Sequence, residues 1–229
     1  MKKIILMFSA ALMASGVSAQ SNITADNLSP FRGLQASGNR IELYVTQNPE
    51  LPLSMTVDLN GNDPNMLKWW ETEGMLQIKY TPKNKEKPVV IRLNCHTLEE
   101  LELTGVSMTM EGLWRQDMVT VSLYSSARLM AEIYAKDLKV NTQTSATAVI
   151  KGGGRYADYD TRSKSVLDVR NYEVESAFLR AGGYSECYVY GKERLIIEAL
   201  DGAAVFYRGM PEIFRERTSR GGHTNPIGE

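Results

Sequence analysis

The chain has 229 residues, of which 43% are hydrophobic and 8% aromatic, and its formal net charge at pH 7 is -1. This length and apolar content suffice for one folded domain with a single core. Because the charges almost balance, the chain lacks the basic surface that nucleic-acid binding requires, and we expect no nucleic-acid partner.

Residues 1–19 have the three parts of a secretory signal peptide. Lys2 and Lys3 precede an apolar run from residue 4 to residue 13, and the small residues Ser18 and Ala19 follow it. The run is too short for a membrane anchor. Cleavage after Ala19 removes both lysines and takes the net charge from -1 to -3. With no cysteine near this site to acylate and no second long apolar segment, we expect export without a transmembrane anchor, to the periplasm, the outer-membrane surface or the outside.

Short segments of alternating apolar and polar residues follow, and each is typical of a half-buried β-strand. They are separated by stretches rich in Asn, Gly, Pro and Lys, which are typical of turns. Strands are predicted at residues 41–47, 75–82 and 89–95, and turns at 60–65 and 81–88. No long segment has helical periodicity, so we predict an all-β fold.

From residue 98 onward an apolar-x-apolar triplet recurs at nearly constant spacing. Its starts lie 18, 19, 19, 20 and 18 residues apart, at Leu101, Val119, Leu138, Ala157, Ala177 and Leu195. A fixed period of this length is typical of a solenoid, in which each repeat buries its apolar face against its neighbours. Strand alternation places the first and third residues of each triplet inside, and the residue after the triplet outside.

A second strand is predicted ten residues after each triplet start, with Leu129, Ala148, Leu167, Cys187 and Val205 pointing inward. Small residues between the strands, as at 142–146, 182–183 and 201–203, mark the corners of the coil. We therefore predict a parallel β-solenoid over residues 20–213, with an irregular strand region at its N-terminal end. The polar residues 214–229 are predicted to form a flexible tail.

Both cysteines are predicted to be buried, since Cys95 and Cys187 each fall at an inward position. They lie about five rungs apart, which at a strand spacing of about 4.8 Å places them on the order of 24 Å from each other. A disulfide requires Cα atoms within about 7 Å. We predict two free thiols.

Five phrases of the sequence, taken in order, resemble one known family. They are PFRGLQASG (30–38), LEELELTG (98–105), LKVNTQTSATAVIKG (138–152), GRYADYDTRS (154–163) and FYRGMPEI (206–213). The chain resembles the head GIN domain family of the Bacteroidetes, whose members are described as auto-transporter adhesins. The resemblance implies a right-handed, single-stranded β-helix in a secreted or envelope protein, and it implies no catalytic motif. The corners at 123–126 and 161–164 differ from the family's usual Ser-Gly-Ala sequence.

Two features that can carry chemistry have simpler explanations here. The run Gly152 to Gly154 is not followed by a helix whose N-terminus would hold a phosphate, so we interpret it as a tight turn. His96 and His223 are the only histidines, and neither has a ligand partner at suitable spacing. We predict no metal and no cofactor.

An enzyme of the parallel β-helix type, acting on carbohydrate, is the alternative function that the sequence leaves open. Such an enzyme needs paired carboxylates, and the repeat places Asp158, Asp160 and Glu198 near one another. Arg180 is predicted to lie between Asp160 and Glu198, which separates the two carboxylates by about 9.6 Å. This exceeds the range of about 6.5–9.5 Å for inverting enzymes, and the constant rung length leaves no room for cleft-forming loops. We therefore interpret this column as a solvated ion ladder.

A non-enzymatic, adhesin-like binding module is the function we favour from the sequence. Tyr188 and Tyr190 are predicted to project outward from the second strand, and an exposed aromatic pair on a flat sheet suits contact with a glycan or a protein. The candidate binding residues are these two tyrosines together with Asp160, Arg180 and Glu198, which we expect to border the same surface. One of Trp69 and Trp70 is expected in the core and the other exposed, where it stacks on a sugar or caps the coil. The expected partner is a glycan, an envelope protein or another copy of the chain.

Overall fold

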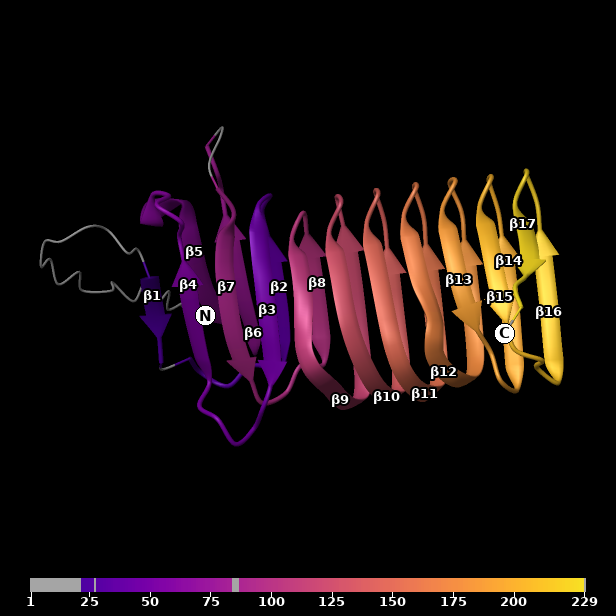
Figure 1. Ribbon diagram of the computed structural model, residues 1–229, viewed down its shortest axis with the longest axis horizontal. Helices are drawn as coiled ribbons and strands as arrows, with labels where there is room; N and C mark the ends of the chain where they lie inside the picture. The colour runs from indigo at the N-terminus through magenta and orange to yellow at the C-terminus, as the bar shows by residue number, and fades with distance from the viewer. Residues whose placement is uncertain (1–21, 27, 84–86, 229) are drawn as a thin grey trace, which may run out of the picture.

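The computed structural model describes residues 22–26, 28–83 and 87–228, and the predicted signal peptide lies outside these ranges. The chain forms one elongated coil of strands whose turns stack along its long axis (Figure 1). The 3-10 helix η1 (Pro64–Met66) is the one helical element in the described part of the chain, where we find no helix of the length and hydropathy needed to cross a bilayer. The predicted β-solenoid is confirmed.

Each turn of the coil contributes to two sheets that face each other across the core. The first sheet contains, in spatial order, β1 (Asn22–Ala25), β4 (Ser54–Asp58), β7 (Val89–Cys95), β3 (Ile41–Gln47), the first halves of β9 to β12, β13 (Glu186–Tyr190), β15 (Ala204–Arg208) and β17 (His223–Pro226). The second sheet contains β5 (Leu67–Thr72), β6 (Met75–Tyr80), β2 (Gly33–Ser37), β8 (Glu100–Thr104), the second halves of β9 to β12, β14 (Arg194–Ala199) and β16 (Ile213–Thr218).

Four long strands bend at the lower edge of the coil and belong to both sheets. They are β9 (Ser107–Tyr124), β10 (Arg128–Thr142), β11 (Thr147–Thr161) and β12 (Val166–Ala181). Their parallel pairing continues from one sheet through the bend into the other, as in the ladder from Arg128 opposite Thr147 to Thr142 opposite Thr161. The bend therefore replaces a loop on this edge.

The N-terminal strands stack in an order that differs from their order in the chain. The rung formed by β2 and β3 lies between the β6–β7 rung and the β8–β9 rung, because β2 pairs with both β6 and β8 and β3 pairs with both β7 and β9. Beyond β6 and β7 the end of the coil is closed by strands that run antiparallel, β5 against β6 and β4 against β7, with β1 outside β4. This closure is the irregular region that the sequence predicts.

The inward columns of the repeat are confirmed from β9 onward. Val119, Leu138, Ala157, Ala177 and Leu195 lie opposite one another on successive rungs, as do Leu129, Ala148, Leu167, Cys187 and Val205, and all of them are buried. The first spacing was wrong: Leu101 lies opposite Val121, and Glu102 rather than Thr104 shares the outward column of Ser122.

A bulge in β9 explains this shift of register. Thr109 lies opposite Met130, and Leu113 lies opposite Glu132, so β9 contains two extra residues between these pairs. Gly112 in this segment has a φ of 90°, a conformation that suits glycine. Because the slip is two residues, it leaves the inward and outward faces unchanged.

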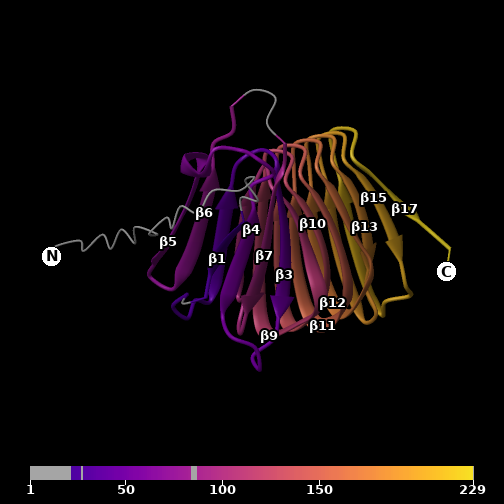
Figure 2. The same ribbon diagram turned by 60° about the vertical axis from the view of Figure 1, so that its left-hand side comes forward.

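The upper corners are tight turns in which two consecutive residues adopt left-handed backbone conformations. At one of them φ is 59° for Thr144 and 62° for Ser145. Left-handed conformations cost L-residues other than glycine on the order of 1 kcal/mol each. Each corner hydrogen bonds to the next, so the corners align along one edge (Figure 2). These bonds include Ser126 N to Thr144 O at 2.9 Å, Ser145 N to Ser163 O at 2.9 Å and Lys164 N to Gly183 O at 2.8 Å.

The glycine run lies in the bend of β11, within a continuous strand rather than in the tight turn that we predicted. A Cβ atom on Gly154 would lie 2.1 Å from the carbonyl oxygen of Ala135 and 2.5 Å from the hydroxyl of Tyr172. Tyr172 is fully buried and donates a hydrogen bond to that same carbonyl at 3.3 Å. The missing side chain therefore makes room for the Tyr172 ring inside the bend, and no phosphate-binding helix follows.

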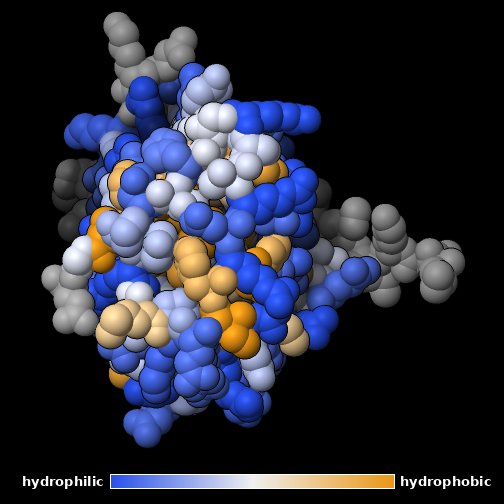
Figure 3. Space-filling view, turned by 90° about the vertical axis from the view of Figure 1, so that its right-hand side faces the viewer, coloured by the Kyte–Doolittle hydropathy of each residue, from blue (hydrophilic) through white to orange (hydrophobic). Residues whose placement is uncertain are grey.

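The prediction of a flexible tail is wrong, because β16 and β17 form the last rung of the coil. Glu216 lies opposite Ile197 and Thr224 lies opposite Val205, so polar residues occupy inward positions here. The Thr224 hydroxyl donates to Glu216 at 2.6 Å. No other described strand stacks on this rung, so its inward polar groups remain exposed, and a charge at a sheet edge discourages pairing with another chain. Figure 3 shows this end, where a few apolar side chains lie among hydrophilic ones.

Both cysteines are buried and free, which confirms the prediction. Since the β2–β3 rung is inserted between β7 and β9, β7 and β13 are six strand spacings apart, about 29 Å. Burial raises the pKa of each thiol to about 12. Both thiols therefore remain protonated and unreactive at neutral pH.

Candidate functional site

Tyr188 projects from the outer face of the first sheet as the middle layer of a three-layer stack. On one side its ring stacks on Phe206, with 5.0 Å between centroids and 17° between planes. On the other side the Arg170 guanidinium lies 3.8 Å from the ring centroid and binds Asp168 at 2.8 Å. Both faces of Tyr188 are thus covered, and its hydroxyl donates to Glu186, which raises the pKa of this phenol. The ring presents an edge to solvent.

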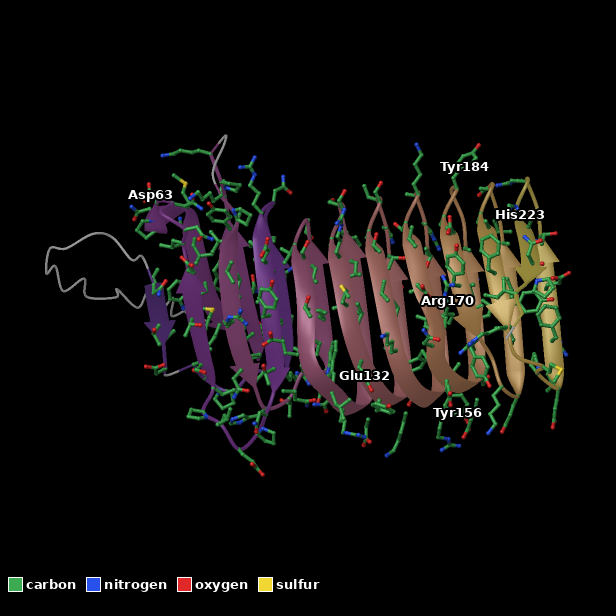
Figure 4. All side chains as sticks on the ribbon, viewed as in Figure 1. Asp63, Glu132, Tyr156, Arg170, Tyr184 and His223 are labelled. Atoms are coloured by element: carbon green, nitrogen blue, oxygen red, sulfur yellow. The ribbon has the colours of Figure 1, made fainter. Side chains whose placement is uncertain are left out.

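Tyr190 lies two residues further along β13, on the same outer face. The Arg208 guanidinium lies 5.5 Å from its ring centroid and reaches Asn171 at 3.4 Å. The buried Nε of Arg208 has no hydrogen-bond acceptor among the described residues. The two tyrosines therefore belong to an arginine-aromatic cluster at the C-terminal half of the first sheet, where Figure 4 labels Arg170.

Asp160, Arg180 and Glu198 lie on the outer face of the second sheet, on successive rungs. Arg180 binds Glu198 at 3.0 Å, whereas Asp160 binds Arg162 through two hydrogen bonds of 2.6 Å. Each carboxylate has an arginine partner, as expected for an ion ladder, but Arg180 does not bridge the two. The side chains remain partly exposed, so these ion pairs contribute little to stability.

The structure does not bring the five candidate residues together. The two strands of one rung face each other across the core, so their outward side chains point in opposite directions. Tyr188 and Tyr190 lie on the first sheet, and Asp160, Arg180 and Glu198 lie on the second. The expectation that the ion ladder borders the tyrosine surface is therefore wrong, and each face must be considered by itself.

A shallow hollow of about 190 Å³ lies on the outer face of the second sheet near its lower edge. Met118, Asp137 and Tyr156 occupy one column on successive rungs, with the short aspartate between two long apolar side chains. Met118 is 61% exposed and Tyr156 is 51% exposed, and Figure 4 labels Tyr156 at this edge. Thr120, Lys139 and Asp158 complete the polar part of the lining. Sequence reasoning missed this site because the triplets that set the register begin one residue after this column, at residues 119, 138 and 157.

The two histidines lie far from each other in the coil. His96 Nε2 lies 2.8 Å from the carbonyl oxygen of Leu51, and His223 lies exposed in β17. Across residues 22–26, 28–83 and 87–228 no three His, Cys, Asp or Glu side chains are placed to hold a metal ion.

Comparison with solved structures shows three similar folds from Bacteroidetes. A putative adhesin from Bacteroides fragilis aligns with a TM-score of 0.79 and 16% identity over 91% of this chain and 98% of its own. A putative adhesin from Parabacteroides merdae gives 0.64 and 11% over 91% and 96%. A putative lipid binding protein from Parabacteroides distasonis gives 0.65 and 17% over 90% and 97%. At these identities the likeness concerns the fold alone.

The family comparison is more specific. No protein of curated function matches the chain. The family model described as "Putative auto-transporter adhesin, head GIN domain" matches residues 30–211, which include the coil from β2 to β15. The chain therefore belongs to the head GIN domain family.

Proposed function

We propose that this chain is a non-enzymatic, adhesin-like module of the cell envelope or cell exterior that binds glycan through the outer faces of its coil. The observation that carries the proposal is the hollow between Met118 and Tyr156. Two large apolar side chains flank the Asp137 carboxylate in a space of about 190 Å³. Drug-sized ligands need about 300–1,000 Å³, so this hollow suits one sugar ring, whose apolar face packs on Tyr156 while its hydroxyls donate to the aspartate.

Export by the predicted signal peptide is part of this proposal, and the family's adhesin description supports an envelope or external location. The tyrosine cluster on the first sheet provides a second contact surface. Because both ring faces of Tyr188 are covered, we propose that Tyr188 and Tyr190 contact a partner through ring edges and hydroxyls. The alternative partner is another copy of the chain. Size-exclusion chromatography of the purified chain detects association between copies.

The test is a glycan array with the purified chain, followed by titration of the best glycan. Tyr156→Ala should weaken binding by about tenfold, because it removes the stacking surface. Tyr184→Ala is the matched control, since Tyr184 is 74% exposed at the opposite, upper edge. Equal affinity of wild type and Tyr156→Ala would overturn the assignment of this hollow.

The enzymatic alternative has its own test. Both Asp160 and Glu198 are held in ion pairs with arginine, so neither carboxylate can reach a substrate without breaking its pair. We therefore expect Asp160→Ala and Glu198→Ala to change glycan affinity by no more than about threefold. This change is smaller than the loss expected when one hydrogen bond to a charged group is removed. If the wild type cleaves a glycan and either substitution abolishes this cleavage, the protein is an enzyme and the binding-module proposal fails.

A further inference from the structure

A second hollow, of about 460 Å³, lies on the antiparallel cap at the N-terminal end of the coil. It opens on the outer face of the second sheet between η1, β5 and β6. The strands β5 and β6 are labelled toward the left of Figure 1. Its lining is Asn65, Met66, Lys68, Trp70, Lys79 and Thr81. This volume falls within the range of about 300–1,000 Å³ that is typical of small-molecule sites.

Two lysines lie side by side in this hollow. Lys68 on β5 and Lys79 on β6 are directly opposite each other in the antiparallel pair. Like charges at directly opposite positions of a sheet destabilise it. Among the described residues no carboxylate lies within ion-pair distance of either lysine, whereas Lys83 lies 4.0 Å from Asp63. An anion between the two ammonium groups would remove this repulsion.

Trp70 provides an apolar surface beside the lysines. It lies two residues after Lys68 and therefore on the same face of β5, and it is 42% exposed. Trp69 points the other way and packs, partly buried, against the core, as expected for adjacent residues of a strand. Trp70 lies opposite Gln77, which adds a polar group beside the indole. The cap thus combines an aromatic surface, two positive charges and neutral hydrogen-bonding groups.

We propose that this hollow binds a single acidic sugar residue of the glycan ligand. The sugar's carboxylate or sulfate lies between Lys68 and Lys79, its apolar ring face packs on Trp70, and Asn65 and Thr81 bond its hydroxyls. This assignment rests on the proposed function and adds the ligand's charge to it. The ring-shaped apolar surface favours a saccharide over a bare phosphate, and the paired lysines favour an anionic ring over a neutral one.

The test compares two probes with one backbone, hexagalacturonate and its neutral methyl ester, in calorimetric titrations of the purified chain. Hexagalacturonate should bind, and the ester should bind at least about tenfold more weakly, because each hydrogen bond to a charged group contributes about 1.5–3 kcal/mol. Affinity for the acid should fall as salt rises. Tryptophan fluorescence gives an independent signal, since Trp114 is fully buried and Trp70 is exposed.

The variants are the double substitution Lys68→Gln with Lys79→Gln, Trp70→Ala, and the control Lys164→Gln, at an exposed upper corner outside both hollows. The double variant should lose at least about tenfold in affinity for hexagalacturonate, and Lys164→Gln should match the wild type. Without a probe the double variant should melt at or above the wild-type temperature, because it loses a like-charge contact. Trp70→Ala should abolish the fluorescence change.

The outcomes separate this inference from the proposed function. If hexagalacturonate binds equally well to the wild type and to the double variant, the lysine site is wrong and the binding module stands. If the ester binds as tightly as the acid, the charge assignment is wrong. If anionic lipid vesicles bind to the lysine site and no saccharide does, the ligand class is wrong. If no glycan binds the wild type, both proposals fail.

Discussion

Two buried tyrosines should respond with opposite signs to the loss of one oxygen atom. Tyr159 is fully buried between Val140 and Leu179 of the inward column, and its hydroxyl has no hydrogen-bond partner among the described residues. Tyr172 is also fully buried, but its hydroxyl donates to the Ala135 carbonyl at 3.3 Å. An unsatisfied buried polar group costs about 1–3 kcal/mol, and a hydrogen bond contributes about 1 kcal/mol.

Tyr159→Phe should therefore raise the free energy of unfolding. Removing the oxygen leaves a void on the order of 10 Å³, which at about 24 cal/mol per Å³ costs about 0.2 kcal/mol. The net gain is about 1–3 kcal/mol. Tyr172→Phe should lower the free energy of unfolding by about 1 kcal/mol, because it removes a satisfied donor and leaves the Ala135 carbonyl without this hydrogen bond.

Urea unfolding followed by circular dichroism measures both variants against the wild type, at unchanged slope so that the midpoints can be compared. A loss of stability in Tyr159→Phe as large as that in Tyr172→Phe would contradict an unsatisfied hydroxyl at Tyr159. It would show that the Tyr159 hydroxyl has a partner that stabilises it.

Three further predictions test the coil. Val140→Asp places an unpaired carboxylate at a fully buried position and should cost about 3–5 kcal/mol of stability. The outward substitution Asn141→Asp should cost at most about 1 kcal/mol. Equal effects in thermal melts would contradict the assignment of Val140 to the inner face and Asn141 to the outer face. Gly154→Ala would place a methyl group 2.1 Å from a carbonyl oxygen and should cost about 1–3 kcal/mol, so a neutral effect in urea would argue against the bend. Burial raises the thiol pKa of Cys95 and Cys187 from 9.0 to about 12. Between pH 9 and 12 the unfolded chain therefore loses these protons while the folded chain keeps them, and the free energy of unfolding falls as pH rises. Replacing both cysteines by alanine should make this fall smaller in melts recorded across that pH range.

The repeating part of the fold could be predicted because burial there follows a strict alternation. The slip in β9 could not, since Val119 and Val121 are both inward and either fits opposite Leu101 as a pattern. Only the bulge at Gly112 distinguishes them, and a single glycine in a strand has several possible explanations. The same periodicity therefore predicts the inward and outward faces of the strands correctly and the residue opposite Leu101 incorrectly.

The two ends of the coil were harder to predict, because their residues do not have neighbours on both sides. At the C-terminal end, Glu216 occupies an inward position without the partner rung that would exclude a charge, so the sequence of β16 resembles a polar tail. At the other end, β2, β6 and β8 share one alternation pattern, and alternation does not say which strand lies between which. The stacking order is set by tertiary pairing.

The candidate sites also differ between the regular rungs of the coil and the places where the regular rungs end or bend. Within the coil, rungs of nearly constant length present stacked columns, and stacked side chains satisfy one another, as the Arg170–Tyr188–Phe206 layers and the Arg180–Glu198 pair do. Two places depart from this regular stacking. Beside the bend, Met118 is exposed and the Arg155 guanidinium lies 5.3 Å from the ring centroid of Tyr156, and on the antiparallel cap Lys68 and Lys79 face each other. Since a ligand is bound most tightly by groups that the protein itself leaves unpaired, the lysine pair of the cap should contribute most to the recognition of an acidic ligand, and the tyrosines of the first sheet should add contacts through their ring edges and hydroxyls.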